Sequence, residues 1–352
     1  MKEKLLPTVA LIFGGRGHER DVSTKGAEYV FPLIDDAVYR KIPIFIEKTG
    51  AWLIPALRDI SACPRALADG VIPSTECAPA YLNSSPGLLT EGEFIPLTAA
   101  FPLLHGDFGE DGTVQGALEN AKIPFVGCDV QASAISRDKA FVKTIAKHLG
   151  IPTARWLYLI GKFDESMIKD AESEIGYPAF VKPARLGSSV GASPAKNRAE
   201  LDVALRRALA VGSGRAIVEK LVDVESELEC GYFSAKGKEL FTNIGKISYT
   251  SNFYDYETKY KNSCATLRTN ADVTERERNK IREYSSALVR MLGISGMSRI
   301  DFFRTSDGRI LFNEINTIPG FTESSLYPRL VSESGISPRE LVNRLTFDAC
   351  DA

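Results

Sequence analysis

The stretch that decides the fold is residues 299–316, which read Arg-Ile-Asp-Phe-Phe-Arg-Thr-Ser-Asp-Gly-Arg-Ile-Leu-Phe-Asn-Glu-Ile-Asn. Asp307-Gly308 is a strong signal for a two-residue hairpin turn, because a type I′ turn needs positive φ at both central residues. With that pair as the turn, Asp301 lies opposite Glu314 on the neighbouring strand. The stretch therefore predicts a hairpin that holds two acids side by side.

Two acids on one face repel each other unless a cation lies between them, since directly opposed residues have Cβ atoms about 4.5–5.5 Å apart. Arg299 and Asn316 are also opposed, and because side chains alternate between faces they share the face of the acids. Oxygen ligands from Asp301, Glu314 and Asn316 suit a hard ion, Mg²⁺ or Mn²⁺. Arg299 suits an anion beside it. A solvated hairpin face is the alternative, but four convergent polar groups favour a metal–phosphate site.

The bulk properties are those of a soluble protein with room for two or three domains in its 352 residues. The formal net charge is −2 and no long run of Lys or Arg occurs, which indicates neither nucleic-acid nor membrane binding. No apolar stretch is long enough to span a bilayer. The six cysteines are scattered without a Cys-x-x-Cys pair, a pattern typical of reduced cytosolic thiols rather than of disulfides or zinc.

Alternating strand and helix patterns predict a parallel α/β unit over residues 1–130. A buried strand and the loop Gly-Gly-Arg-Gly-His-Glu-Arg-Asp-Val-Ser begin it. The dinucleotide-binding fingerprint fails there, because its third glycine would fall at Arg20. Residues 55–98 give no clear pattern. Strands are expected at 8–13, 39–46, 99–104 and 124–126, and helices from about residue 23 and over 113–120.

A second unit, residues 131–220, delivers Lys182 to a Gly/Ser loop that can cover phosphates with backbone N–H groups. The loop also contains Gly-x-Ser-x-Gly, the serine-hydrolase elbow. That fold needs a histidine after the serine, whereas every histidine precedes Ser189, so a hydrolase is disfavoured. A nucleotide sensor without catalysis also stays open. Helices are expected at 136–149 and 199–209, and strands at 156–160, 179–182 and 215–220.

The third unit, residues 221–352, contains the hairpin and ends in helices. Strands are expected at 227–233 and 239–247, followed by an aromatic and charged loop at 252–261. A long helix over 274–292 has Thr274 as a plausible N-cap.

Five motifs spread over nearly the whole chain together resemble the D-alanine–D-alanine ligases of the ATP-grasp superfamily. Gly17 and Ser226 depart from the usual pattern, which carries a serine and an arginine there. The motifs are Gly-Gly-x-x-x-Glu-Arg-x-Val-Ser, Leu-His-Gly-x-x-Gly-Glu-Asp-Gly, Val-Lys-Pro-x-x-x-Gly-Ser-Ser-Val-Gly, Phe-Tyr-Asp-Tyr-Glu-x-Lys-Tyr and Asn-Glu-x-Asn-Thr-x-Pro-Gly.

The resemblance implies a three-domain ATP-grasp fold, α+β with an N-terminal parallel α/β domain. It implies ATP-dependent ligation of two D-alanine molecules through D-alanyl phosphate, for peptidoglycan precursors, by a cytoplasmic homodimer that uses two Mg²⁺ or Mn²⁺ ions. Ligases that add D-serine or D-lactate are the alternative. Tyr260, which closes the lid motif, and Leu326, an apolar wall, favour D-alanine, because a buried hydroxyl without a partner costs about 1–3 kcal/mol.

The resemblance also assigns residues. Glu19 would pair with the ammonium of the first D-alanine, and Ser188 and Tyr260 would hydrogen-bond towards Glu19 and close loops over the site. Arg299 would stabilise the transferring phosphoryl group and the oxyanion. The ATP site would comprise Lys139, Lys182, Ser188, Ser189, Glu219, Lys220, Val222, Glu227 and Lys259. The metals would lie on Asp301, Glu314 and Asn316, and the amino acids beside Glu19, Val22, His105, Arg299, Gly320, Ser325 and Leu326.

Overall fold

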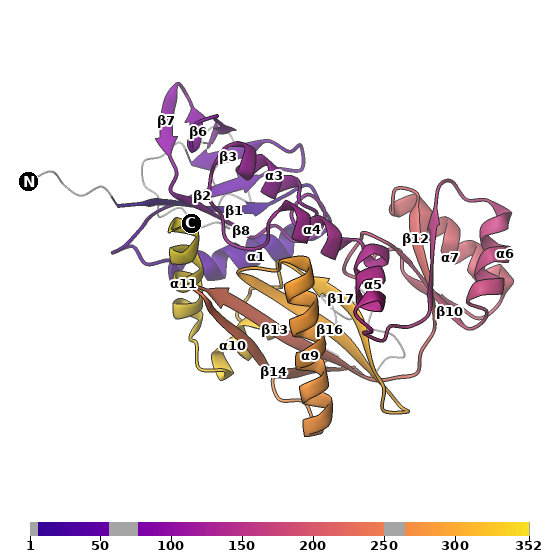
Figure 1. Cartoon of the computed structure of the whole chain (residues 1–352). Coiled ribbons are helices and arrows are strands. Elements are labelled where there is room, and N and C mark those ends of the chain that lie inside the picture. The colour runs from indigo at the N-terminus through magenta and orange to yellow at the C-terminus, as the bar shows by residue number, and fades with distance from the viewer. Residues whose placement is uncertain (1–5, 56–76, 250–264, 352) are drawn as a thin grey trace, which may run out of the picture.

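The computed structural model describes residues 6–55, 77–249 and 265–351, which build four β-sheets with helices around them (Figure 1). The first sheet has the strand order β4-β3-β2-β1-β8. Its central strand β1 is buried along its whole length, as a near-continuous apolar run predicts. The strands are β1 (Thr8–Gly14), β2 (Arg40–Ile46), β3 (Trp52–Pro55), β4 (Cys77–Pro79) and β8 (Ala99–Pro102).

The first sheet is parallel only at its centre. β1 pairs in parallel with β2 and β8, as predicted, whereas β3 and β4 add antiparallel strands at one edge. The strand expected at 124–126 is a single bridge between Ala100 and Phe125. A small sheet fills part of the stretch without a clear pattern. Its strands are β5 (Tyr81–Leu82), β6 (Gly87–Thr90) and β7 (Glu93–Pro96), and the helices of this unit are α1 (Arg20–Val30), η1 (Phe31–Leu33) and α3 (Thr113–Asn120).

The central unit lies at one side of the molecule, around an antiparallel sheet of order β11-β10-β12-β9 (Figure 1). The helix expected over 136–149 is in fact two, α4 (Val130–Arg137) and α5 (Lys139–His148). Asp138 separates them with an extended backbone, and its carboxylate accepts from the N–H groups of Ala140 and Phe141 as an N-cap. The other elements are β9 (Trp156–Ile160), α6 (Glu165–Glu174), β10 (Ala179–Pro183), β11 (Ser193–Ala195), α7 (Arg198–Val211) and β12 (Arg215–Lys220).

The third sheet has the order β15-β14-β13-β16-β17 and carries the predicted hairpin. Its long helix α9 (Glu275–Leu292) begins with a capping box, in which Thr274 and Glu277 bond each other's backbone N–H. The remaining elements are β13 (Val224–Ala235), β14 (Lys238–Tyr249), β15 (Ala265–Arg268), β16 (Met297–Thr305), β17 (Ile310–Asn316), α10 (Leu326–Glu333) and α11 (Pro338–Cys350).

The hairpin turn differs from the predicted type, yet the predicted pairs are present. Residues 306–308 form a three-residue turn with Gly308 at φ +78°, closed by the bonds between Thr305 and Arg309. That shifts the register by one residue, and a bulge at Asn313 shifts it back. Asp301 therefore still faces Glu314.

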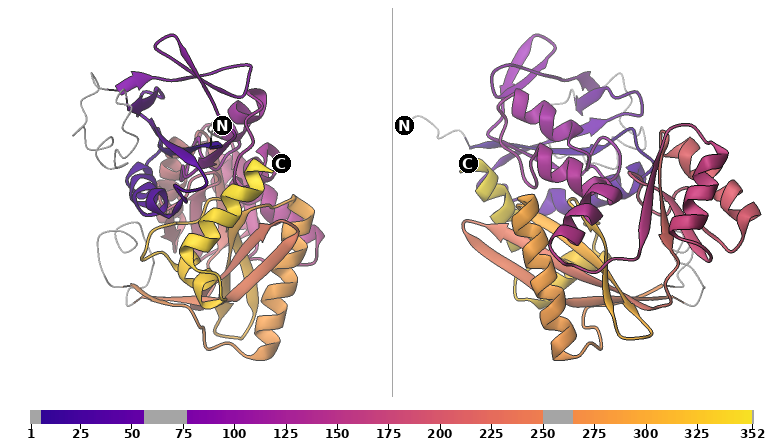
Figure 2. Two further views of the ribbon diagram at one scale, coloured as in Figure 1. Left: turned by 90° about the vertical axis from the view of Figure 1, so that its left-hand side faces the viewer. Right: turned by 45° about the vertical axis from the view of Figure 1, so that its right-hand side comes forward.

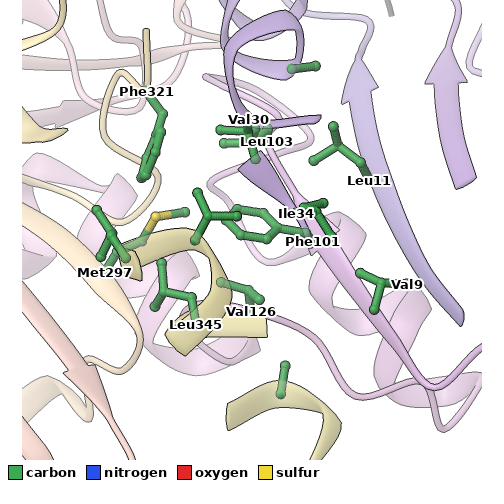
Figure 3. Packing of buried hydrophobic residues seen from close by; sticks show 14 of the residues in the cluster. Val9, Leu11, Val30, Ile34, Phe101, Leu103, Val126, Met297, Phe321 and Leu345 are labelled. Carbon is green, nitrogen blue, oxygen red and sulfur yellow. The ribbon is translucent and has the colours of Figure 1, made fainter. Parts of the chain in front are cut away.

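The first and third units share one hydrophobic core. Figure 3 shows Met297, Phe321 and Leu345 packed towards Phe101 and Val126. The C-terminal helix α11 lies between the two units, as Figure 2 shows at the left, and contacts β8. The predicted domain boundaries at 130 and 220 stay predictions, but residues near the C-terminus clearly help to bury the first sheet.

Two further expectations concern the chain as a whole. Within residues 6–55, 77–249 and 265–351, no helix is long and apolar enough to cross a membrane. The four cysteines in this part of the chain, at 77, 128, 230 and 350, are not joined in disulfides.

We expect Leu345→Ala to lower the free energy of unfolding by about 2–4 kcal/mol, because Leu345 is buried in the core that joins the first and third units. Denaturant unfolding measures this change. Arg344→Ala, which removes an exposed side chain on the same helix, is the control and should cost under about 0.5 kcal/mol. Equal stability of the two variants would contradict the shared core.

Candidate functional site

A cavity of about 1190 Å³ opens where the three units meet. Its wall includes every sequence-predicted site residue that the structure describes. Lys259 and Tyr260 lie outside the described residues, so their predicted roles remain predictions. The wall carries Glu19, Val22, His105, Lys139, Lys182, Ser188, Ser189, Glu219, Lys220, Val222, Glu227, Arg299, Asp301, Glu314, Asn316, Gly320, Ser325 and Leu326.

The hairpin face extends one strand further than the sequence predicted. Glu229 on β13 pairs with Asp301, which pairs with Glu314, so three carboxylates cross three strands in one row. Arg299 binds Asp301 through both planar edges, Nε to Oδ1 at 2.8 Å and Nη2 to Oδ2 at 2.7 Å, and its Nε lies 3.1 Å from Glu229. Glu229 could have been found from the sequence, because it shares a strand face with the predicted ligand Glu227.

Cationic side chains relieve the repulsion expected between the two acids. Lys139 Nζ lies 3.2 Å from Glu314, and it also donates to the Leu186 carbonyl at 2.7 Å. Arg299 neutralises Asp301, and the Asn316 amide donates to the same carboxylate at 2.9 Å. Burial lowers the pKa of Lys139, although Glu314 opposes this shift. The face thus already attracts positive charge from two directions.

A hard cation fits the chemistry of this donor set. Asp301, Glu314 and Asn316 offer only oxygen ligands once the Asn316 amide turns its carbonyl inwards. Arg299 and Lys139 occupy the two carboxylates as positively charged stand-ins. Among the described residues, no group of three or more His, Cys, Asp or Glu side chains is arranged to hold a metal by itself. The donor set is therefore one that phosphate oxygens would complete.

Behind the cavity wall lies a buried cluster that the sequence did not predict. Glu219 bridges two lysines, with Oε1 2.8 Å from Lys143 Nζ and Oε2 2.8 Å from Lys182 Nζ. Lys182 also donates to the amide oxygen of Asn313, the bulge residue, at 3.3 Å. Burial alone would raise the pKa of Glu219, but the two ammonium groups hold it at about 2. Glu219 is thus not part of a solvated face, the alternative that its exposed-looking sequence context allowed.

The Gly/Ser loop after Lys182 is held in a sparsely populated conformation. Ser188 and Ser189 both have positive φ, +50° and +58°, which costs each residue roughly 1–3 kcal/mol. The Ser188 hydroxyl donates to the Glu19 carboxylate, which ties the loop to the start of α1. Gly106 lies so close to Glu19 that a Cβ there would come within 2.5 Å of Oε2. The loop strain is therefore coupled to the position of Glu19.

Glu110 joins the three units beside the cavity, a role that the sequence did not predict. Its carboxylate accepts from the N–H of Gly106 at 2.9 Å and of Ile318 at 3.3 Å, and it lies 3.3 Å from Arg137. Burial raises the pKa of Glu110 to about 7, against the effect of Arg137. The signal was available, because Glu110 lies in the motif Leu-His-Gly-x-x-Gly-Glu-Asp-Gly.

His105 binds the other end of the same peptide unit. Its Nδ1 donates to the Ile318 carbonyl at 2.9 Å, so in the neutral ring Nε2 is an acceptor. Nε2 is buried on the cavity side without a hydrogen-bond partner among the described residues. Burial lowers the pKa of His105, although Glu19 opposes this shift. A ligand that carries an N–H or O–H donor would satisfy this atom.

The far end of the cavity is apolar. Leu326 packs with Ile247 and Leu330, and a Cβ on Gly245 would come within 2.8 Å of its side chain. Ser325 is occupied locally, since its hydroxyl accepts from the Thr322 N–H at 3.0 Å. The wall beside Leu326 therefore suits a small apolar group.

Family models match most of the chain. The model described as D-ala D-ala ligase N-terminus matches residues 8–128, and the model described as D-ala D-ala ligase C-terminus matches residues 145–346. The chain is 37% identical over 350 residues to a D-alanine–D-alanine ligase of Caldicellulosiruptor bescii, covering 96% of this chain and 93% of that relative. It is 36% identical over 351 residues to one of Deinococcus radiodurans, covering 98% of each.

Solved structures agree over nearly the full length. The VanG D-Ala:D-Ser ligase of Enterococcus faecalis superposes with a TM-score of 0.87 at 31% identity, covering 98% of this chain and 99% of that one. The D-alanine–D-alanine ligase of Coxiella burnetii gives a TM-score of 0.86 at 28% identity, covering 98% and 94%. The ATP-grasp fold expected from the sequence motifs is confirmed.

We expect His105 to stay neutral at pH 6 in the folded protein. Its pKa is lowered, so between pH 7 and 5 the unfolded chain takes up a proton that the folded chain refuses, and stability falls as the pH drops below about 6.5. Nitrogen NMR of labelled histidines reads the ring charge, and His105→Gln identifies the signal. The protein unfolded in urea is the control. An imidazolium signal from His105 at pH 6 would refute this expectation.

Proposed function

Because this chain belongs to the D-alanine–D-alanine ligase family, it is an ATP-dependent ligase that joins two D-alanine molecules, and we propose that it does so in the cavity where its three units meet. The observation that carries this proposal is the single wall shared by Lys139, Lys182, Arg299 and the opposed acids Asp301 and Glu314. Phosphoryl transfer needs charge neutralisation and positioning more than covalent help, and this wall offers both.

The triphosphate lies along the lysines and under the strained loop. Lys139 and Lys182 bind its oxygens, and the N–H groups around Ser188 and Ser189 cover them. The strand end at Glu219, Lys220 and Val222 meets the adenine, and Glu227 meets the ribose. These assignments rest on the resemblance and on the position of each residue in the cavity wall.

The two amino acids lie between α1 and the loop that follows β17. Glu19 binds the ammonium of the first D-alanine, whose carboxylate attacks the γ-phosphate to give D-alanyl phosphate and ADP. The amine of the second D-alanine then attacks the acyl carbon, and phosphate leaves. Arg299, beside Asp301 and Glu229, stabilises the oxyanion of the tetrahedral intermediate. The ring of His105 and the wall of Val22, Gly320, Ser325 and Leu326 orient the amino acids.

Asp301, Glu314 and Asn316 would hold two divalent ions, Mg²⁺ or Mn²⁺. When bound, these ions neutralise the β- and γ-phosphate oxygens. Arg299 and Lys139 now pair with the same carboxylates, so each must give up that pair when ATP arrives with its ions. Both side chains are then free to contact phosphate oxygens. Glu229 keeps a partner for Arg299 throughout this exchange.

D-serine is the competing second substrate, since one structural relative is named for it. Leu326 supports D-alanine, because it gives that end of the cavity an apolar wall where a hydroxyl would lack a partner. We also propose a cytoplasmic homodimer active in cell-wall precursor synthesis, on the resemblance alone. A serine hydrolase and a non-catalytic nucleotide sensor are not retained, since the curated relatives are named as ligases.

We expect Glu314→Gln and Asp301→Asn to lower turnover roughly a hundredfold or more while the protein stays folded. Each removes a carboxylate from the metal face, and its cationic partner keeps another acceptor, Leu186 for Lys139 and Glu229 for Arg299. Phosphate release that depends on D-alanine measures turnover, and thermal unfolding without metal is the control. Wild-type turnover in either variant would remove the metal face from the mechanism.

With D-alanine, D-serine and D-lactate at equal concentration and neutral pH, we expect D-alanyl-D-alanine to be the main product by about tenfold or more. The reason is the apolar wall at Leu326. Mass spectrometry of the products with ATP and Mg²⁺ is the measurement, and reactions without ATP are the control. A mixed dipeptide or depsipeptide as the main product would show that Leu326 does not set the choice.

A further inference from the structure

Lys143 is a cation that the proposed mechanism does not use. It lies on α5 one turn after Lys139, so both side chains point to the same side of the helix. Lys139 reaches Glu314 on the hairpin, whereas Lys143 reaches Glu219. The Lys143 side chain is only 1% exposed, and it is not among the described residues that line the cavity. It therefore cannot touch ATP in this structure.

The cost of burying this ammonium group calls for a physical explanation. A buried charge needs partners, and Lys143 has Glu219 at 2.8 Å and the Phe312 carbonyl at 3.4 Å. A hydrophobic side chain of similar size often serves stability as well as a buried ion pair does. Burial lowers the pKa of Lys143, although Glu219 opposes this shift, so the site bears the cost of a charged lysine.

Counting charges in the cluster shows what Lys143 contributes. Lys143 and Lys182 carry two positive charges and Glu219 one negative charge, so the cluster has one positive charge in excess. Each lysine takes a different oxygen of the carboxylate. Lys182 is the member on the cavity wall and Lys143 the member behind it. Without Lys143, Glu219 and Lys182 would form a neutral pair, and the excess charge facing the cavity would vanish.

We propose that Lys143 is a positioning residue for ATP: by neutralising Glu219 from behind, it leaves the charge of Lys182 available to the phosphates. This inference rests on the proposed function, in which the phosphates lie beside Lys182. Lys143 acts only through Glu219, and its effect is on the triphosphate rather than on either amino acid.

The test compares Lys143→Met with Lys147→Met. Lys147 lies one further turn along α5 and is exposed, so the control removes the same charge from the same helix. In Lys143→Met we expect the dissociation constant of ATP with Mg²⁺, measured by calorimetry, to rise about tenfold to hundredfold, the range for one charge-assisted hydrogen bond. The KM for D-alanine and the inhibition constant of adenosine, which has no phosphate, should stay within about threefold. Lys147→Met should match wild type in all three.

A double variant separates charge from packing. In Lys143→Met with Glu219→Gln, Lys182 again carries one positive charge in excess, so ATP should bind more tightly than to Lys143→Met alone. A packing defect at residue 143 would persist in the double variant. Because this variant leaves no unpaired buried acid, it also serves if Lys143→Met alone does not fold, and then it should bind ATP within about tenfold of wild type.

Two results would overturn the inference: wild-type ATP affinity in Lys143→Met, or equal weakening of adenosine and ATP. Failure of the double variant to bind ATP better than the single one would also overturn it. These outcomes leave the proposed function standing as long as the wild-type protein binds ATP and releases phosphate with D-alanine. A wild-type protein that binds no ATP would reject both.

Discussion

The site depends on one constraint, the register between β16 and β17. A strand slipped by one residue would turn Asp301 and Glu314 to opposite faces, one of them into the core of Ile300 and Phe302. A three-residue turn and a bulge at Asn313 each shift the register by one, and the shifts cancel. The bulge also brings the Asn313 amide to Lys182, so the irregularity that preserves the metal face helps to position the phosphate side.

Around this face, every buried charge has a partner on another element, and the partners come from all three units. Glu314 meets a lysine of α5, Asp301 an arginine of its own strand, and Glu219 two lysines. Such pairs contribute little net stability once desolvation is counted. Their value lies in a set of charges fixed in a dry site, where they act strongly on a polyanion that replaces the water.

Local patterns carried much of the prediction. The α3 and β12 bounds follow from periodicity, and the Thr274 cap from a side chain three residues from its partner. The motifs led to the cavity wall because a family resemblance supplied their meaning. Local reasoning failed where partners are distant: Lys143 meets Glu219 and Glu110 meets Ile318 across long loops. It also missed the break at Asp138, because an acid between two helical patterns reads equally well as an interior residue or as a cap.

The bond of the first unit to the loop after β17 uses main-chain atoms of residue 318, whose N–H meets Glu110 and whose carbonyl meets His105. Recognition of a peptide unit is indifferent to the side chain that it carries, apart from proline, which has no N–H to donate. The identity of residue 318 is thus free to answer to the hydrophobic core alone, where Ile318 is buried. Mutations that tune packing at this junction can therefore accumulate without loosening the link between the units.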